Sequence, residues 1–323
     1  MSSCSLTGVR EESSSILHNR YATLPLIIGY VRARIKPALG WLKLKKLTYA
    51  HVASFYQDKL TAGAAPASVN KLHVTLHKAL DQAVKWTMIL RNVSEAVKAP
   101  SPASKEMRTL SADQVRAMLR AAQGDRLEAL YVLAVHTGMR QGELLALKWP
   151  DVNLRDGRVS IRRTITKSGG RLLRGEPKTA KSRRTITLTT GSLNALRAHR
   201  KRQLAGMMQH MGLWQDHELV FASEAGTLIN PTNLRKRHVA SLLERAGLPA
   251  DTRFHDLRHT CATLLLGKGV HPKFVQELLG HANIAITLDT SSQVIPHMGD
   301  ATARAMEDTL EGEQPGVQDA EDA

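Results

Sequence analysis

Cysteine is scarce in this sequence: only Cys4 and Cys261 occur in 323 residues. Two cysteines are too few for a disulfide framework or for a cysteine-based zinc site, and they fit a reducing cytoplasm. Long apolar runs are also missing, since none approaches the ~20 residues that a helix needs to cross a bilayer. The first residues are serine-rich and polar, without a hydrophobic signal segment. We therefore expect a cytoplasmic protein that has no membrane partner.

Acidic residues are few relative to basic ones. Asp and Glu number 29 against 45 Lys and Arg, which gives a formal net charge of +16 and a sequence pI near 10.1. A chain this basic most often meets a polyanion, and nucleic acid is the first candidate. The alternative is a generally basic surface without such a ligand. A length of 323 residues predicts two domains, each able to bury its own core.

A helix is predicted over residues 64–87 by its apolar periodicity. Apolar side chains recur at steps of three and four residues and define one face. They are Val69, Leu72, Leu76, Leu80 and Ala83. Lys71, Lys78 and Lys85 repeat every seven residues, roughly opposite that face. This lysine stripe could follow a phosphate backbone, and an ordinary solvated helix face is the alternative interpretation.

Residues 98–108 indicate a linker between two domains, because they hold two prolines and several small polar residues. Ser111 and Gln114 then form the pattern of a capping box that starts a helix. A second helix, about 126–136, is predicted to end at Gly138. From residue 307 onwards the chain has seven acids and no Lys or Arg, which predicts a disordered acidic tail.

The hydrophobic period changes to two after residue 158. Val159, Ile161 and Ile165 alternate with polar residues as in a half-buried strand, and residues 185–188 supply another strand. Between residues 155 and 184 there are eleven Lys or Arg and two acids, an excess that favours salt-sensitive phosphate binding. The candidate DNA contacts of this segment are Arg162, Arg163, Lys181 and Arg183.

Two histidines and an arginine lie close together in one C-terminal stretch. His255 and Arg258 are three residues apart, so on a helix they share one face. Gly280 is typical of a left-handed helix cap, which directs His281 out of the turn. Two imidazoles and a guanidinium suit a phosphate, because they donate hydrogen bonds to its charged oxygens. His255 and His259 also resemble a metal pair, but no Glu follows His255 and no third ligand is evident. We therefore expect no metal and no cofactor.

These residues lie in motifs that resemble the phage integrase, or tyrosine recombinase, family. The sequence has T-G-M-R-Q-G-E-L-L-A-L-K-W at 137–149, P-K-T-A-K-S-R-R-T-I at 177–186, H-D-L-R-H at 255–259 and L-G-H at 279–281. The resemblance implies a mainly α fold with a small β-hairpin or sheet, in the two-domain DNA-clamp architecture of that family. Its implied segments are 1–27 unassigned, 28–97 a helical core DNA-binding domain that lacks a recognisable further helix at its front, 98–108 a linker, 109–306 the catalytic domain and 307–323 the acidic tail.

The resemblance also implies a chemistry. Family members attack a phosphodiester with a tyrosine, forming a 3′-phosphotyrosyl link and releasing a 5′-hydroxyl, without a metal or cofactor. The implied catalytic residues are Arg140, Lys178, His255, Arg258 and His281. The arginines would bind the non-bridging oxygens, the histidines would assist proton transfer, and Lys178 would protonate the leaving 5′-oxygen, with Lys181 as its competitor. The implied partner is double-stranded DNA at attachment-type sites of mobile elements, bound by a tetramer in the nucleoid.

The nucleophilic tyrosine of the family is missing. Family members end the pattern with T-L-D-T-Y-S-H, whereas this chain reads T-L-D-T-S-S-Q at 287–293, so Ser291 stands at the tyrosine position. A phenol, with a pKa near ~10, is a better leaving group than the alkyl hydroxyl of serine, which is also shorter. We expect a DNA-binding site-specific recombinase whose strand transfer is impaired or abolished. The alternatives are a non-catalytic DNA-binding protein that occupies attachment sites or joins active protomers, and a working Ser291 nucleophile.

Overall fold

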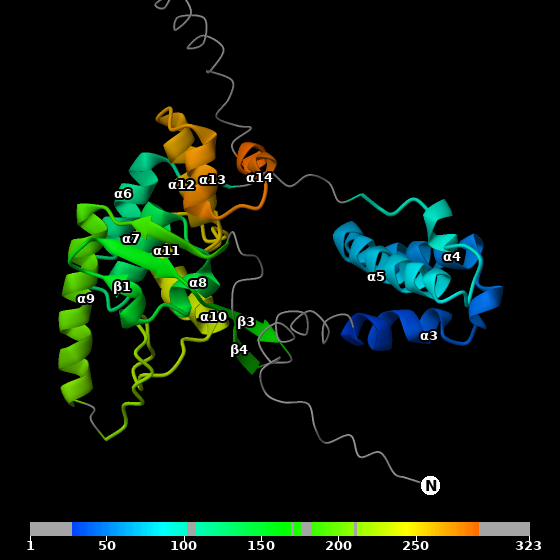
Figure 1. Cartoon of the computed structure of the whole chain (residues 1–323), viewed down its shortest axis with the longest axis horizontal. Helices are drawn as coiled ribbons and strands as arrows, with labels where there is room; N and C mark the ends of the chain where they lie inside the picture. Colours follow the sequence, from blue (N-terminus) through cyan, green and yellow to red (C-terminus); the bar gives the residue numbers. More distant parts are fainter. Residues whose placement is uncertain (1–27, 102–107, 169–170, 176–181, 210–211, 291–323) are drawn as a thin grey trace, which may run out of the picture. The chain divides into compact units, whose positions relative to one another are not determined.

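The computed structural model describes residues 28–101, 108–168, 171–175, 182–209 and 212–290 (Figure 1). The chain divides into two compact units. The first unit is Met1–Glu106 with Ile165–Glu176, and the second unit is Met107–Thr164 with Pro177–Ala323. Several predicted features lie outside the described residues: the first 27 residues, the acidic tail, Lys178, Lys181 and Ser291.

The first unit is mainly helical. Its helices in order are η2 (Val31–Ile35), α3 (Lys36–Leu39), η3 (Leu44–Lys46), α4 (Tyr49–Thr61), α5 (Pro66–Lys85) and η4 (Val93–Ala96). The core forms where the apolar faces of α4 and α5 meet. Its buried residues are Ile35, Val52, Phe55, Tyr56, Val69, Leu72, Leu76 and Leu80. Burial of these side chains stabilises the unit by removing apolar surface from water.

Helix α5 confirms the helix predicted over residues 64–87. It begins at Pro66, whose fixed φ and missing N–H suit the first helical position. All five predicted apolar positions are buried on one face. Lys71, Lys78 and Lys85 are exposed, as expected for side chains on the opposite face of an amphipathic helix.

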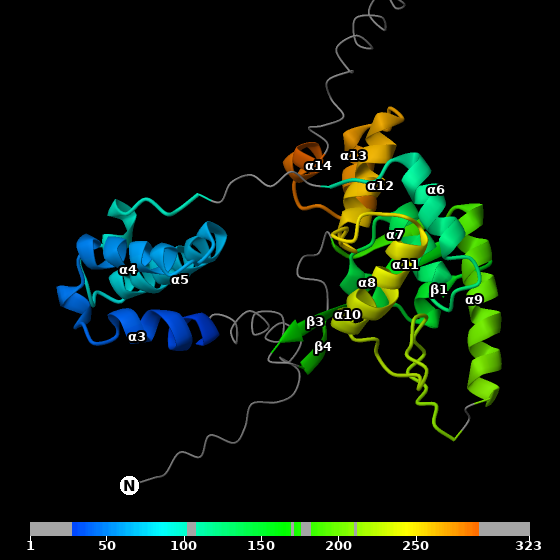
Figure 2. The same cartoon turned by 180° about the vertical axis from the view of Figure 1, so that it is seen from behind.

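The second unit consists of helices around a small sheet (Figure 1; Figure 2). Its helices are α6 (Ala112–Ala121), α7 (Glu128–Thr137), α8 (Gln141–Leu145), η5 (Trp149–Asp151), α9 (Thr190–Gln209), α10 (Pro231–Asn233), η7 (Leu234–Val239), α11 (Ala240–Arg245), α12 (Asp256–Gly267), α13 (Pro272–Leu279) and α14 (Ile284–Thr290). Helix α7 is the central one, because it packs against α9, α12 and α6 and is apolar nearly all round. Nowhere in the described residues does a helix combine the length and apolarity needed to span a membrane.

The strands form two small antiparallel arrangements. β1 (Val152–Asn153), β2 (Arg158–Ile161) and β5 (Arg184–Thr187) form a sheet in the order β1-β2-β5, and β3 (Thr164–Ser168) pairs with β4 (Arg171–Gly175). Val159 lies opposite Ile186 in the β2–β5 register. The mainly helical architecture with small sheets confirms the predicted fold class.

One strand prediction is wrong in its extent. The alternation from Val159 to Thr166 predicts a single strand, whereas the structure breaks it at Arg162 and Arg163 into β2 and β3. Arg163 Nη1 instead donates to Asp151 Oδ2 at 2.6 Å. The apolar side chains on either side of the break remain buried as predicted, so alternation located the buried face correctly and missed only the interruption.

The predicted helix ends are confirmed where they bear on the site. Ser111 and Gln114 form a reciprocal capping box at the start of α6. Gly138 ends α7 with φ of 59°, and Gly280 ends α13 with φ of 67°. Only glycine adopts this left-handed backbone without a steric penalty, so both turns depend on the residue type.

Candidate phosphate-binding site

Four predicted catalytic residues lie at helix ends in the second unit. Arg140 immediately precedes α8, His255 precedes α12, Arg258 lies in the first turn of α12, and His281 follows Gly280 after α13. These positions place the four side chains at or next to the ends of helices. The four residues come from three segments that are far apart in the sequence.

Two arginine hydrogen bonds join those segments. Arg140 Nη2 donates to the carbonyl oxygen of Gly280 at 3.2 Å, across 140 residues of sequence. Arg258 Nη1 donates to the carbonyl oxygen of Gly138 at 2.7 Å, across 120 residues. The starts of α8 and α12 and the turn after α13 therefore meet at one place, which we call the arginine pocket.

Close packing at the two glycines fixes this meeting point. A Cβ on Gly138 would collide with Leu279 Cδ2 and crowd Cys261 Sγ. A Cβ on Gly280 would lie 2.8 Å from Arg184 Nη1. Because both backbones are left-handed as well, any side chain here would strain the turn and displace a neighbour.

Arg258 is a buried cation that has an unused hydrogen-bond donor among the described residues. Its residue exposure is 3%, and its Nη2 has no hydrogen-bond partner among the described residues. Burial, together with the neighbouring charge of Arg140, lowers the pKa of the guanidinium to about 9. A buried N–H group without a partner is costly, so this donor is positioned for an anion.

The two site histidines are held in the neutral form. Burial lowers the pKa of His281 to about 3, assisted by the charges of Arg258 and Arg140. His281 Nδ1 lies 2.9 Å from Thr287 Oγ1 on α14, which leaves Nε2 as the nitrogen available to a ligand. Partial burial also lowers the pKa of the more exposed His255 to about 4, with His259 and Arg258 adding to the effect. Both imidazoles thus adjoin the same cations.

Sequence reasoning missed two residues that hold the pocket together. Glu143 is 3% exposed and accepts hydrogen bonds from Arg140 N at 3.0 Å and Arg140 Nη1 at 2.8 Å. Arg184 donates through Nη2 to Glu143 Oε2 at 3.1 Å and through Nε to the carbonyl oxygen of Leu278 at 2.6 Å. Glu143 could have been found, because it lies three residues after Arg140 on a helix. Arg184 carries no local signal, since Glu143 is 41 residues away.

The charge balance of the pocket favours an anion. Burial alone would raise the pKa of Glu143, but the charge of Arg184 and the hydrogen bonds from Arg184 and Arg140 lower it overall. Glu143 is therefore ionised and offsets one of the three guanidinium charges of Arg140, Arg184 and Arg258. The remaining positive charge can stabilise the oxygens of a bound phosphodiester.

The predicted DNA contacts outside the pocket have different surroundings. Arg163 is held by the buried carboxylate of Asp151, and Arg162 Nε lies 3.9 Å from the same carboxylate, so this pair also secures the strand break. Arg183 is exposed beside β5. In the first unit, the lysine stripe of α5 is exposed along its length.

His255 and His259 do not gather a metal-ligand set around them. Their ring centroids are 4.8 Å apart in an edge-to-face arrangement. In the described part of the chain, no further histidine, cysteine or carboxylate is close enough to complete a three-ligand group with them. The pair therefore belongs to the same neutral imidazole cluster as His281.

Comparison with known proteins gives one consistent family. The phage integrase family model matches residues 108–313. A "Tyrosine recombinase XerC-like" protein from Caldanaerobacter subterraneus subsp. tengcongensis is 32% identical over 294 residues, covering 85% of this chain and 75% of that protein.

Solved structures show the same fold. The Tn1549 transposon integrase in complex with a circular intermediate DNA superposes with a TM-score of 0.71 at 18% identity, covering 94% of this chain and 95% of that one. A lambda integrase tetramer bound to a Holliday junction gives a TM-score of 0.59 at 22% identity, covering 88% of this chain and 73% of that one.

Proposed function

This chain belongs to the phage integrase family, and we propose that it is a DNA-binding site-specific recombinase whose strand-transfer step is impaired by Ser291. The observation that carries the proposal is the arginine pocket. Arg140 and Arg184 pair with the Glu143 carboxylate, and Arg258 keeps a buried donor that has no partner among the described residues. A phosphodiester carries one negative charge and two non-bridging oxygens. Its charge is opposite in sign to the two residual positive charges of this pocket, and its oxygens can accept hydrogen bonds from the pocket's donors.

Each pocket residue has a role in the proposed reaction. Arg140 and Arg258 bind the non-bridging oxygens and stabilise the charge that develops on them as the nucleophile attacks. His281 and His255, neutral before DNA binds, donate or accept a proton near the same oxygens. Lys178, which the family pattern assigns to the leaving group, gives its proton to the departing 5′-oxygen.

Nucleophilic attack on the phosphorus is the step of the family reaction for which this chain is least suited. In the family reaction, a phenolic oxygen forms the new bond to phosphorus while the bond to the 5′-oxygen breaks, and the second strand's 5′-hydroxyl later expels the phenolate. Ser291 offers an alkyl hydroxyl, whose pKa is above that of a phenol and whose conjugate base leaves less readily. Its side chain is also several bonds shorter than that of tyrosine, so on the family pattern its Oγ would fall short of a phosphate placed for a phenol.

We further propose that the protein acts on double-stranded attachment-type sites, in an assembly of several protomers on the bacterial nucleoid. The relatives support this proposal, because one solved neighbour is a tetramer bound to a Holliday junction and another is an integrase from a transposon. Arg140, Arg258, His255 and His281 all remain in place. Their retention favours a recombinase that lost its nucleophile over a specialised non-catalytic DNA-binding protein, which is the second candidate.

A covalent-adduct assay tests the proposed function. Wild-type protein and Ser291→Tyr are each mixed with nicked DNA from the flanks of the gene and separated on a denaturing gel. We expect no shifted protein–DNA band from the wild type and a shifted band from Ser291→Tyr. A band from the wild type would show a working nucleophile in this chain. If neither protein gives a band while both bind the DNA, the non-catalytic alternative is supported.

A further inference from the structure

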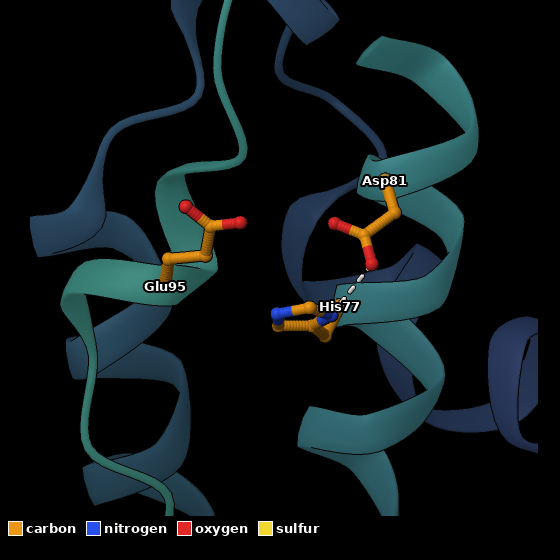
Figure 3. Close-up of side chains that lie close together, drawn as sticks. All are labelled: His77, Asp81 and Glu95. Carbon is orange, nitrogen blue, oxygen red and sulfur yellow. Dashed lines mark ion pairs between the residues drawn. The ribbon is translucent and has the colours of Figure 1, made fainter. Parts of the chain in front are cut away.

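The first unit holds a cluster of side chains that the recombinase function does not use. Residues 28–101 contain twelve Lys or Arg but only three acids, Asp58, Asp81 and Glu95. Two of these three acids lie together beside His77 (Figure 3). In a unit so rich in lysine, two carboxylates would ordinarily each find a lysine or arginine partner, and among the described residues neither does.

The ligand atoms of this cluster lie close enough together to hold a small cation. His77 and Asp81 are one helical turn apart on α5, with His77 Nδ1 3.0 Å from Asp81 Oδ2, and Glu95 approaches from η4. One ligand atom from each residue lies within 4.8 Å of the others. Figure 3 shows the imidazole between the two carboxylates. Donors around a tetrahedral Zn²⁺ at ~2.1 Å are roughly 3.4 Å apart, so only a small movement of the exposed Glu95 is needed.

A buried residue orients the cluster from behind. Asn92 is 5% exposed, and its Nδ2 donates to Asp81 Oδ1 at 2.5 Å. Its Oδ1 accepts from Ser94 N at 3.0 Å, which caps η4 and so sets the position of Glu95. Because one Asp81 oxygen is occupied by Asn92, the other is directed at His77. Supporting hydrogen bonds of this kind fix metal ligands in place.

We propose that His77, Asp81 and Glu95 bind a divalent transition-metal ion of the Zn²⁺ class, which ties α5 to η4. Imidazole nitrogen with carboxylate oxygen selects such ions over Mg²⁺, which prefers oxygen ligands and retains its water. Three protein ligands leave a fourth position for water. The role is structural, because η4 is the last helix before the chain continues to Pro100. An ion that is bound only in the folded state stabilises that state.

Metal titration of the full chain tests this site. The protein is treated with EDTA, dialysed and titrated with Zn²⁺ or Mg²⁺, with calorimetry and Tm as readouts. We expect one Zn²⁺ per chain at this site, a higher Tm for the first unit and no comparable effect of Mg²⁺. Glu95→Gln keeps the size of an exposed side chain, and we expect it to weaken Zn²⁺ binding at least ~10-fold. Asp58→Asn, which removes the remaining acid of residues 28–101, is the matched control.

Two results would overturn the proposal. Zn²⁺ binding that is equal in wild type and Glu95→Gln would place the ion elsewhere, for example on the histidines of the arginine pocket. His217→Ala is the control for Zn²⁺ binding to an exposed imidazole. The second result is a Tm that does not change with Zn²⁺ but that depends on pH in the wild type and not in His77→Ala. It would show that a protonated His77 bridges the carboxylates instead. Neither result depends on strand-transfer activity.

Discussion

The arginine pocket of the second unit and the His77 cluster of the first unit use similar side chains in opposite proportions. In the pocket, one buried carboxylate, Glu143, pairs with Arg140 and Arg184 while a further guanidinium keeps a free donor. In the cluster, two carboxylates flank one imidazole, and no Lys or Arg in the described residues pairs with them. The sign of the excess charge decides the kind of ligand. The excess positive charge of the pocket suits an anion, and the excess negative charge of the cluster suits a cation.

Removing the carboxylate from the pocket gives the largest expected effect on stability. Glu143→Gln leaves the buried Arg184 charge without its partner, and breaking one side of a buried ion pair costs about 3–5 kcal/mol. The free energy of unfolding, measured by urea titration, reports the loss. Glu128→Gln disrupts the more exposed Arg202 pair, so we expect a cost of at most about 1 kcal/mol. Similar costs for the two variants would contradict the view that burial makes Glu143 special.

Removing the unpartnered cation affects chemistry more than folding. In the Ser291→Tyr background, we expect Arg258→Ala to reduce covalent-adduct formation by ~10²–10³-fold, the usual loss when one donor to a transition-state oxyanion is deleted. Arg116→Ala, on the exposed face of α6, is the control and should retain adduct formation. The idea fails if Arg258→Ala forms adducts at the rate of its parent while still binding DNA.

The two glycine turns that define the pocket can be tested by contrast with an open glycine. Gly138→Ala combines left-handed strain with a collision against Leu279, whereas Gly124 has φ of 75° and open space around its Cβ position. We expect Gly124→Ala to cost about 1–2 kcal/mol from the backbone alone and Gly138→Ala to cost clearly more. Thermal unfolding of both variants measures the difference, and equal Tm shifts would mean that the packing at Gly138 relaxes freely.

Acidification should weaken the second unit through its neutral histidines. The pKa of His281 is lowered from 6.5 to about 3 in the folded chain, so as pH falls below about 6.5 the unfolded chain takes up a proton that the folded chain does not. The free energy of unfolding therefore decreases as pH falls from 6.5 towards the lower folded pKa. Urea titrations at pH 7.5, 6.0 and 5.0 should show this slope, and His281→Gln should flatten it. His217→Gln, at an exposed position, should leave the slope unchanged.

Local patterns could be predicted from the sequence because their causes are local. The apolar spacing of α5 produces its buried face, the Ser111–Gln114 pair produces a cap, and glycine at 138 and 280 permits left-handed turns. The order of motifs also singled out the arginines and histidines that the structure brings together, and it predicts Ser291 at the tyrosine position. Each of these features depends on residues that are neighbours along the chain, or on a motif that can be recognised without knowing how the chain packs.

Pairings across long sequence separations required the tertiary structure. Glu143 meets Arg184 across 41 residues, and Arg140 reaches the carbonyl oxygen of Gly280 across 140 residues. The break between β2 and β3 occurs at Arg163, which donates to Asp151. It could not be predicted, because apolar and polar residues alternate through the break without interruption. The sequence alone determined which chemical groups this protein holds, and it predicts that Ser291 stands where the family has its nucleophilic tyrosine. Only the packed fold decided which of those groups share a site, because the balance of burial and charge at each site arises between segments that no periodicity connects.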